Sequence, residues 1–138
     1  MKIQRVDTWV ASIEDKPGGL ASKLEPLAAA GVNLEFIIAR RAPDKPGTGV
    51  VFVTPIKGAK QTKAAETAGF RKSNSLHTVR VEGTDKPGTG ARITKALADA
   101  GLNLHGLSAA AIGKKFICHI ALDTEEDAAK AARILRKL

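Results

Sequence analysis

The sequence predicts an α+β protein built from two similar halves, each an antiparallel sheet with helices on one face. Two observations predict this class. The first is a repeat, because two short motifs recur 70 residues further along the 138-residue chain. The second is the hydrophobic period within each half, which changes from the alternation of strands to the three-to-four-residue spacing of helices.

The repeat rests on two separate motifs that keep one offset. Asp-Lys-Pro-Gly at residues 15–18 recurs at residues 85–88, and Gly-Val-Asn-Leu at residues 31–34 recurs as Gly-Leu-Asn-Leu at residues 101–104. Because both motifs keep the same spacing without a gap, duplication explains them better than chance does.

The duplication predicts two domains, a first unit at residues 1–70 and a second unit at residues 71–138. A further Asp-Lys-Pro-Gly, at residues 44–47, does not obey the offset and precedes the strand-like Val-Val-Phe-Val at residues 50–53. We interpret it as a turn between two strands.

Each half is expected to form a strand, a helix, two strands and a second helix. Pro17 and Pro87 suit the first turn of a helix, since the proline ring fixes φ and its missing N–H costs nothing there. Gly31 and Gly101 suit the left-handed end of that helix. The remaining strands are expected at residues 8–14, 34–41 and 50–54 and at 78–82, 104–112 and 116–122, with second helices near 60–68 and 124–137.

The fourth strand differs between the halves. The first half has a candidate at residues 70–76, whereas the second half ends at its second helix. By the 70-residue offset, residues 1–6 correspond to residues 71–76, so we predict that residues 2–6 form the edge strand of the second unit. Each unit would then have the ferredoxin-like βαββαβ order. A second unit with only three strands is the alternative.

Several strands are apolar on both faces, notably residues 36–39, 50–53 and 116–118. Helices cover only one face of such a sheet, and a unit of about 70 residues has little core of its own. We therefore expect the sister unit, another chain or both to cover the rest, which predicts an intrachain pseudo-dimer and a homodimer.

The motifs resemble those of the ACT family of regulatory domains, in which Asp-x-Pro-Gly-x-Leu leads into a helix and Gly-(Ile/Val)-Asn-(Ile/Leu) follows it. Both halves carry the pattern, so the resemblance covers nearly all of the chain. It implies a ferredoxin-like fold, side-by-side pairing of units, amino-acid binding at the junction between units, and a regulatory role toward an attached domain or a partner protein. The second copy departs from the pattern where Leu20 becomes Gly90 and Leu24 becomes Thr94.

The predicted ligand site combines the loop before each first helix with the asparagine after it. Free N–H groups at a helix start suit a carboxylate, and glycines let a ligand approach the backbone. An aspartate could accept from an α-ammonium group, although it could equally cap the helix, and the asparagine could orient a zwitterion or merely form the turn. The candidate residues are Asp15, Gly18, Gly19, Leu20, Asn33, Asp85, Gly88, Thr89, Gly90 and Asn103.

Other chemistry is poorly supported. The net charge of +8 permits nucleic-acid binding, but the basic residues are spread out and not interleaved with the five aromatic residues. His77, His105 and His119 lack metal-ligand spacing, no nucleophile or phosphate-loop motif is present, and Cys118 lies in an apolar run that suits a buried thiol. We expect a cytoplasmic, non-catalytic protein without cofactor, metal or membrane segment.

Three functions remain after this comparison. The first is an amino-acid sensor that modulates a partner enzyme or regulator. The second is a basic RNA-binding ferredoxin-like module, and the third is an assembly subunit that regulates an enzyme without a ligand.

Overall fold

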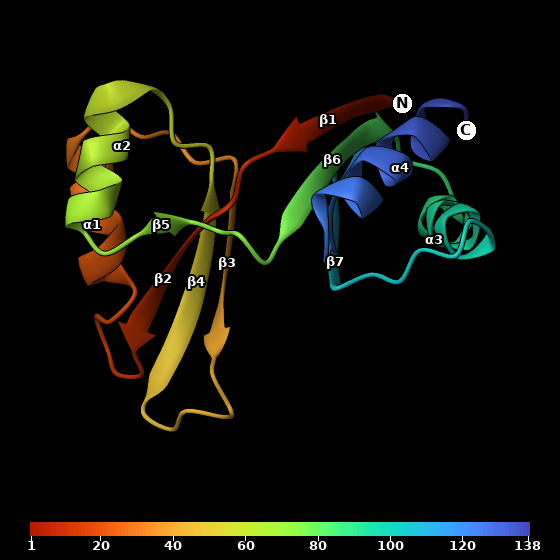
Figure 1. Ribbon diagram of the computed structural model, residues 1–138. Helices are drawn as coiled ribbons and strands as arrows, with labels where there is room; N and C mark the ends of the chain where they lie inside the picture. The colour runs from red at the N-terminus through yellow and green to blue at the C-terminus, as the bar shows by residue number, and fades with distance from the viewer. The chain divides into compact units, whose positions relative to one another are not determined.

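The computed structural model describes residues 1–138 and contains two four-stranded antiparallel sheets, each with two helices (Figure 1). The chain divides into two compact units, one of residues 7–73 and one of residues 1–6 with 74–138. These units differ from the ranges 1–70 and 71–138 because the first six residues join the second unit and residues 71–73 stay with the first. The tandem ferredoxin-like α+β fold is confirmed.

The first unit has the strand order β3-β4-β2-β5. Trp9, Ala11 and Val53 point to the face that the helices cover, and Leu27 of α1 and Ala65 of α2 complete a core with them. The elements of this unit are β2 (Trp9–Glu14), α1 (Ala21–Ala29), β3 (Phe36–Arg41), β4 (Thr48–Thr54), α2 (Gly58–Thr67) and β5 (Arg71–Lys72).

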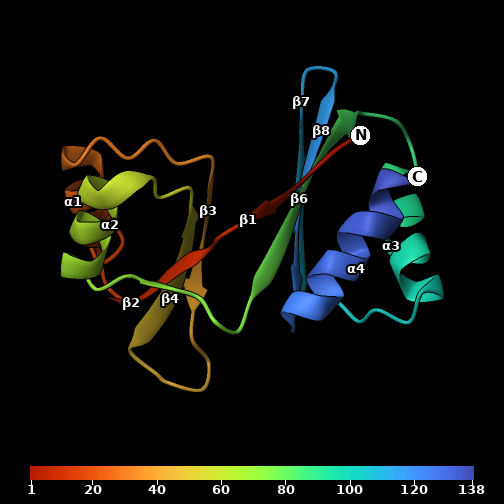
Figure 2. The ribbon, with the colours of Figure 1, turned by 45° about the horizontal axis from the view of Figure 1, so that its top comes forward.

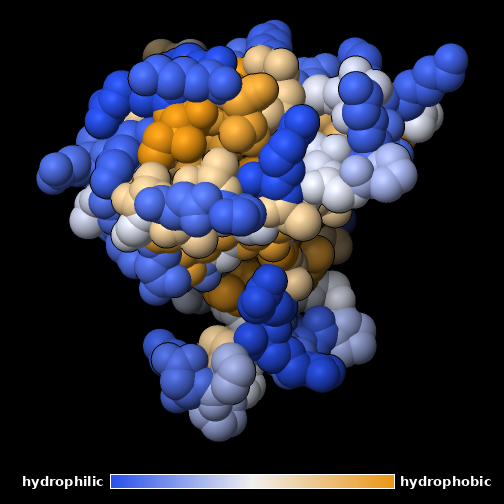
Figure 3. Space-filling view, turned by 90° about the vertical axis from the view of Figure 1, so that its right-hand side faces the viewer, coloured by the Kyte–Doolittle hydropathy of each residue, from blue (hydrophilic) through white to orange (hydrophobic).

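The second unit has the equivalent order β1-β6-β8-β7. Its core contains Val79, Val81, Cys118 and Ile120 from the strands, packed under α3 and α4. The elements are β1 (Lys2–Val6), β6 (His77–Thr84), α3 (Thr89–Asp99), β7 (Gly106–Ile112), β8 (Lys115–Leu122) and α4 (Glu125–Arg136). Figure 3, which views the side of α3 and α4, shows hydrophobic residues exposed between charged ones.

The N-terminal strand completes the second sheet, as the sequence predicts. β1 pairs with β6 in antiparallel register from Lys2 opposite Glu82 to Val6 opposite Thr78 (Figure 2). Ile3 enters the second core beside Val81, because the two residues face each other on the helix side of the sheet. The alternative of a three-stranded second unit is wrong.

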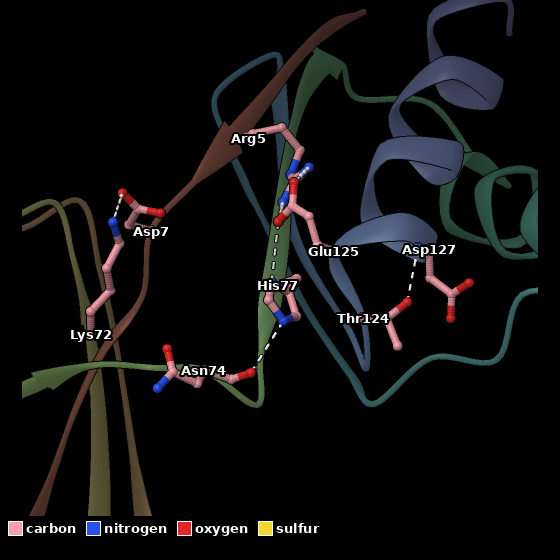
Figure 4. Close-up of polar contacts among 8 residues, drawn as sticks. All are labelled: Arg5, Asp7, Lys72, Asn74, His77, Thr124, Glu125 and Asp127. Atoms are coloured by element: carbon pink, nitrogen blue, oxygen red, sulfur yellow. Dashed lines mark hydrogen bonds and ion pairs between the residues drawn. The ribbon is translucent and has the colours of Figure 1, made fainter.

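Polar contacts fix the far end of this exchanged strand. The Arg5 guanidinium donates two hydrogen bonds to the Glu125 carboxylate, at 2.8 and 2.7 Å, and His77 Nδ1 lies 3.3 Å from the same group (Figure 4). Thr124 caps α4 by accepting a hydrogen bond from the Asp127 N–H at 3.0 Å. The start of α4 thereby holds both β1 and β6.

Two expectations from the sequence need correction. The strand expected near residues 70–76 is only Arg71–Lys72, and it pairs with Val10 and Trp9. Pro17 and Pro87 lie in turns before the helices, not in their first turn, because Gly18 and Gly88 adopt φ of +83° and +84° and interrupt the chain there. The turn expected at residues 44–47 does connect β3 to β4.

Candidate ligand-binding site at the β2–α1 loop

The loop from Asp15 to Leu20 connects the end of β2 to α1 and shares backbone hydrogen bonds with the loop from Asp85 to Gly90, although α3 begins at Thr89 and α1 only at Ala21. In the first unit the Gly19 N–H donates to the Lys16 carbonyl and the Ser22 N–H to the Gly18 carbonyl. The second unit repeats both bonds, at Thr89 and at Arg92. The duplication therefore extends to the geometry of the predicted site.

The backbone of the first loop requires glycine at two positions, independently of any ligand. Gly18 has φ +83°, which L-residues rarely adopt, and a Cβ on Gly19 would collide with the backbone carbonyl of Glu14. Both residues are required to turn the chain this tightly. As a result the backbone at Gly18 is exposed, and no other group lies within 4 Å of the position its Cβ would take.

Several N–H groups of the loop make no hydrogen bond to another backbone group. They are those of Gly18 and Leu20 in the first unit, and Gly88 and Gly90 hold the equivalent positions. Such groups at the start of a helix carry a partial positive charge, so they suit an anion such as a carboxylate. Neither helix has a side chain that caps it.

A hollow of about 530 Å³ lies beside the first loop. It is bounded by the last residues of β2, by the loop and by the first turn of α1. Its lining consists of Ser12, Ile13, Glu14, Lys16, Pro17, Gly18, Gly19, Ser22, Lys23 and Thr48. The predicted glycines Gly18 and Gly19 therefore lie in the wall of a cavity large enough for a small molecule.

Charges of both signs surround this hollow. Lys16 Nζ lies 2.6 Å from the Glu14 carboxylate. That hydrogen bond and the Lys16 charge, with a smaller contribution from Lys23, hold the pKa of Glu14 below its ordinary value. The same hydrogen bond and the Glu14 charge raise the pKa of Lys16. Glu14 is therefore anionic and Lys16 cationic at neutral pH.

The aspartates of the two loops differ. Asp15 accepts a hydrogen bond from Arg41 Nε at 2.9 Å, and its backbone N–H donates to the Gly47 carbonyl. Asp85 shares only the backbone bond, in which its N–H donates to the Lys114 carbonyl. Neither side chain caps its helix, so the capping alternative is wrong for both.

The predicted asparagines lie at the other end of each unit from these loops. Asn33 follows the end of α1 and lies two residues before Glu35, whose N–H donates to the Thr54 carbonyl. Glu14, by contrast, pairs with Thr48. Six residues of β4 separate Thr54 from Thr48, about 20 Å of strand. Asn103 is likewise remote from Asp85 within the second unit, so no pocket of a single unit contains both parts of the predicted site.

The remaining candidates have different surroundings. Leu20 packs against the first core, and Thr89 is buried, with its hydroxyl donating to the Lys86 carbonyl at 2.8 Å. Gly90 has φ outside the left-handed region and no atom near its missing Cβ. Leu20 and Thr89 therefore support the loops, while Gly90 leaves its loop uncovered.

Sequence reasoning missed Ser12 and Lys23, which line the hollow. The signal was in the repeat, because Lys23 lies 70 residues before Ile93. Ile93 is completely buried in the second core, whereas Lys23 is partly exposed and donates to the Ala68 carbonyl at 2.8 Å. The two units therefore differ in polarity at this position, which is core in the second unit and borders the hollow in the first.

Other kinds of site find little support in the structure. No three His, Cys, Asp or Glu side chains gather where they could hold a metal ion. Burial raises the pKa of the Cys118 thiol to about 11, which keeps it protonated and unreactive. None of the four helices has the length and apolar composition needed to cross a membrane.

Comparison with known families decides what kind of fold carries this loop. Residues 77–138 match the model of the ACT domain. The second half of this chain is an ACT domain. Since the first half has the same strand order and the same loop motifs, the chain is a tandem pair of ACT-type units.

Three solved structures with the same fold illustrate the comparison, and two of them are of aspartate kinases. A protein from Bacteroides thetaiotaomicron has a TM-score of 0.80 and 17% identity, over 98% of this chain and 89% of that one. The ligand-free regulatory subunit of aspartate kinase from Thermus thermophilus has a TM-score of 0.66 and 20% identity, over 99% and 94%. Aspartokinase III from E. coli, in complex with aspartate and ADP, has a TM-score of 0.59 and 14% identity, over 98% and 32%. A search of curated proteins finds no match to the sequence.

Proposed function

We propose that this chain is a non-catalytic regulatory protein that senses an amino acid or a similar small molecule and modulates a partner enzyme. The single observation that supports it most is the open hollow at the β2–α1 loop of a tandem ACT-type fold, whose wall includes Gly18 with an N–H that has no backbone partner. The proposed site consists of Gly18 and Gly19 in the wall of this hollow, with Asp15 and Leu20 in a neighbouring hollow that shares Ile13, Glu14 and Lys16 with it.

The regulatory role draws on the relatives of the fold. The Thermus thermophilus relative is itself a regulatory subunit of aspartate kinase, and this chain matches nearly its whole length. The two ACT-type units of this chain cover 94% of that subunit. The proposal keeps the expectation from the family resemblance that a second ACT unit, in this chain or in a second copy of a homodimer, completes the pocket.

Thermal unfolding of the full chain against a panel of amino acids tests this function. A ligand that binds only the folded protein adds about 2.7 kcal/mol at 100 times its dissociation constant, which raises the melting temperature by several degrees. We expect one or a few amino acids to do so. If no amino acid changes the melting temperature and the protein binds RNA in a salt-sensitive way, the RNA-binding alternative replaces the sensor.

A matched pair of substitutions at Ser22 links the shift to the loop. Ser22 is exposed, lines the hollow and donates to the Gly19 carbonyl at 2.9 Å. Ser22→Asp places a carboxylate beside the loop N–H groups, where it competes with an anionic ligand without harming the helix start, since acidic groups are favourable there. We expect Ser22→Asp to abolish the shift and Ser22→Ala to retain it; equal shifts in both variants would remove the loop from the site.

The asparagines are tested separately. Asn33→Ala and Asn103→Ala change exposed residues outside the elements, so both variants should fold. A lost shift would assign that asparagine to the pocket, and a retained shift would remove it.

A further inference from the structure

The edge of β2 beside the hollow lacks a neighbouring strand. The backbone N–H and C=O groups of the odd-numbered residues of β2 point toward β4, as the bond from the Asp15 N–H to the Gly47 carbonyl shows. Those of the even-numbered residues point to the opposite side, where the Thr8 carbonyl accepts from the Ser73 N–H. β5 occupies that other side only opposite Trp9 and Val10. The N–H and C=O of Ser12 and the N–H of Glu14 therefore face the hollow without a strand to receive them.

The sister unit shows what fills the same edge when it is closed. Glu82 lies 70 residues after Ser12, and it pairs with Lys2 of β1. The side chain of Met1 covers the next residue, Gly83, at the place equivalent to Ile13. The hollow at this end of the second unit is about 280 Å³, roughly half of the hollow in the first.

The open edge is only three residues long and is closed at both ends. One end is closed by the segment that connects α2 to β5, where Lys23 Nζ donates to the Ala68 carbonyl. At the other end the β2–α1 loop folds over, with the Lys16 N–H donating to the Glu14 carbonyl. Three strand residues span about 10 Å, so the space suits one or two residues and not a continuous strand of a partner protein.

The charges along this edge match those of a free α-amino acid. A residue added antiparallel to β2 would place its carbonyl end at the Ser12 N–H and its amino end at the Ser12 carbonyl. The carbonyl end then lies toward Lys23, whose ammonium group has two donors left after its bond to Ala68. The amino end lies toward the anionic Glu14.

We propose that a free α-amino acid binds here as a single added strand residue opposite Ser12. Its α-carboxylate accepts from the Ser12 N–H and from Lys23, and its α-ammonium donates to the Ser12 carbonyl and to Glu14. Its side chain points to the same face as that of Ser12, away from the helices. This inference rests on the proposed function but moves the α-carboxylate from the loop N–H groups to the Ser12 N–H and Lys23. A loss of binding in Ser22→Asp with no loss in Ser12→Pro would therefore place the carboxylate at the loop and overturn the strand-edge mode.

Two substitutions at Ser12 test the backbone contact. Ser12→Pro removes the N–H, and proline is tolerated at a strand edge where that N–H has no partner. Ser12→Ala keeps the N–H and removes only the hydroxyl. By isothermal titration calorimetry with the amino acid that gives the largest thermal shift, we expect Ser12→Pro to bind roughly tenfold or more weakly than Ser12→Ala, since the two variants lack the same hydroxyl and differ in the N–H.

A third variant copies the closed unit. Lys23→Ile introduces the residue found at the equivalent position 93, and we expect a loss of roughly tenfold or more because the carboxylate loses a charged donor. Lys60→Met, on the exposed side of α2, is the control for lost positive charge and should bind normally. Circular dichroism of each variant confirms that it is folded.

Ligand analogues test the class of ligand. The amide and the N-acetyl derivative of the same amino acid each lack one α-charge, and both should bind at least tenfold more weakly. An N-acetyl derivative that binds as well as the free amino acid would overturn the proposal in favour of the C-terminus of a polypeptide.

The outcomes separate this inference from the proposed function. If an amino acid binds but Ser12→Pro leaves its affinity unchanged, the strand-edge mode is wrong while the sensor function stands. If no amino acid binds the wild-type chain, both are wrong.

Discussion

The two halves of this chain share one fold but treat the same sheet edge in opposite ways. In the second half, β1 pairs along β6 as far as Glu82, and Ile3 and Ile93 both belong to the core beneath it. In the first half, β5 stops opposite Val10, and Lys23 takes the position of Ile93 beside an open hollow. One edge is built for stability and the other is available to a ligand.

The physical reason lies in how each edge strand reaches its sheet. β5 follows α2 after only three residues, so it cannot extend beyond the point where the helix delivers it. β1 comes from the N-terminus and does not follow a helix of its own unit, so no preceding helix limits its length. It pairs with five residues of β6. Exchange of one strand between duplicated units therefore makes them unequal without changing their folds.

The largest expected effect comes from weakening the closed edge. Ile3→Ala removes a side chain that is 9% exposed and belongs to the second core, so we expect a loss of about 2–3 kcal/mol in the free energy of unfolding. Urea denaturation followed by circular dichroism measures it. Gln4→Ala, whose side chain is exposed on the other face of β1, is the control and should change stability by less than about 0.5 kcal/mol.

Cys118 reports which unit opens in that experiment. Its thiol is 1% exposed in the second core, and burial raises its pKa to about 11, so a thiol reagent at pH 8 should label the wild type slowly. Ile3→Ala should label faster because the second unit opens more often. An unchanged labelling rate alongside the lost stability would contradict the role of β1 in closing this core.

The second prediction compares the loss of stability on replacing the equivalent glycine of each loop. Gly18→Ala and Gly88→Ala force a side chain into φ near +83°, and each should cost about 1–2 kcal/mol in the free energy of unfolding. Thermal unfolding of the two variants measures the loss. Similar losses would show that the two loops have the same backbone, and a loss in only one variant would break the symmetry on which the comparison depends.

Gly90→Ala should act in the opposite direction. Gly90 lies in the first turn of α3, outside the left-handed region, and nothing approaches its missing Cβ. Alanine there should stabilise the second unit by about 0.5–1 kcal/mol, since it reduces the freedom of the unfolded chain. A destabilised Gly90→Ala variant would show that the loop needs this glycine for close approach of another group.

The smallest effect concerns the ion pair that holds β1 to α4. The hydrogen bond from Arg5, aided by its charge and by His77, holds the pKa of Glu125 below its ordinary value. A lowered pKa means that this pair stabilises the fold above about pH 4.3, the ordinary value for the unfolded chain, and that the contribution disappears as the pH falls through the folded value. Glu125→Gln should therefore be slightly less stable than the wild type at pH 7, and the difference should shrink as the pH falls from about 4.3 toward 3.

Varying the ionic strength tests whether the effect of Glu125→Gln on stability is electrostatic. Because the groups are exposed, added salt should shrink the difference between Glu125→Gln and the wild type at pH 7. A difference that persists at pH 3 would assign the effect to packing and not to charge.

Much of the fold was predictable from the sequence because the duplication supplied long-range information. The constant offset of two motifs identified equivalent elements, and it placed residues 2–6 in the second sheet although they are far from residue 82 in the chain. Gly31 and Gly101 were correctly expected to end their helices in the left-handed conformation, with φ of +80° and +78°.

The shortness of β5 was not predictable in the same way. The run Ser-Asn-Ser at residues 73–75 favours a turn, but it does not by itself fix the end of the strand at Lys72. That end also depends on where α2 delivers the chain and where the chain crosses to the other unit. The partner of Asp15 was equally hidden, because Arg41 is brought to it only by the pairing of β3 with β4. The open edge at Ser12 follows from these three-dimensional facts and from no local motif.

Amide hydrogen exchange of Ser12 and Glu82 tests the central claim most directly. Without ligand, the Ser12 N–H should exchange rapidly because no strand receives it, while the Glu82 N–H, which points to Lys2, should be protected. Addition of a binding amino acid should slow the exchange of Ser12 and leave that of Glu82 unchanged. A Ser12 amide that is already protected in the free protein, or that exchanges at the same rate with the amino acid bound, would contradict the account.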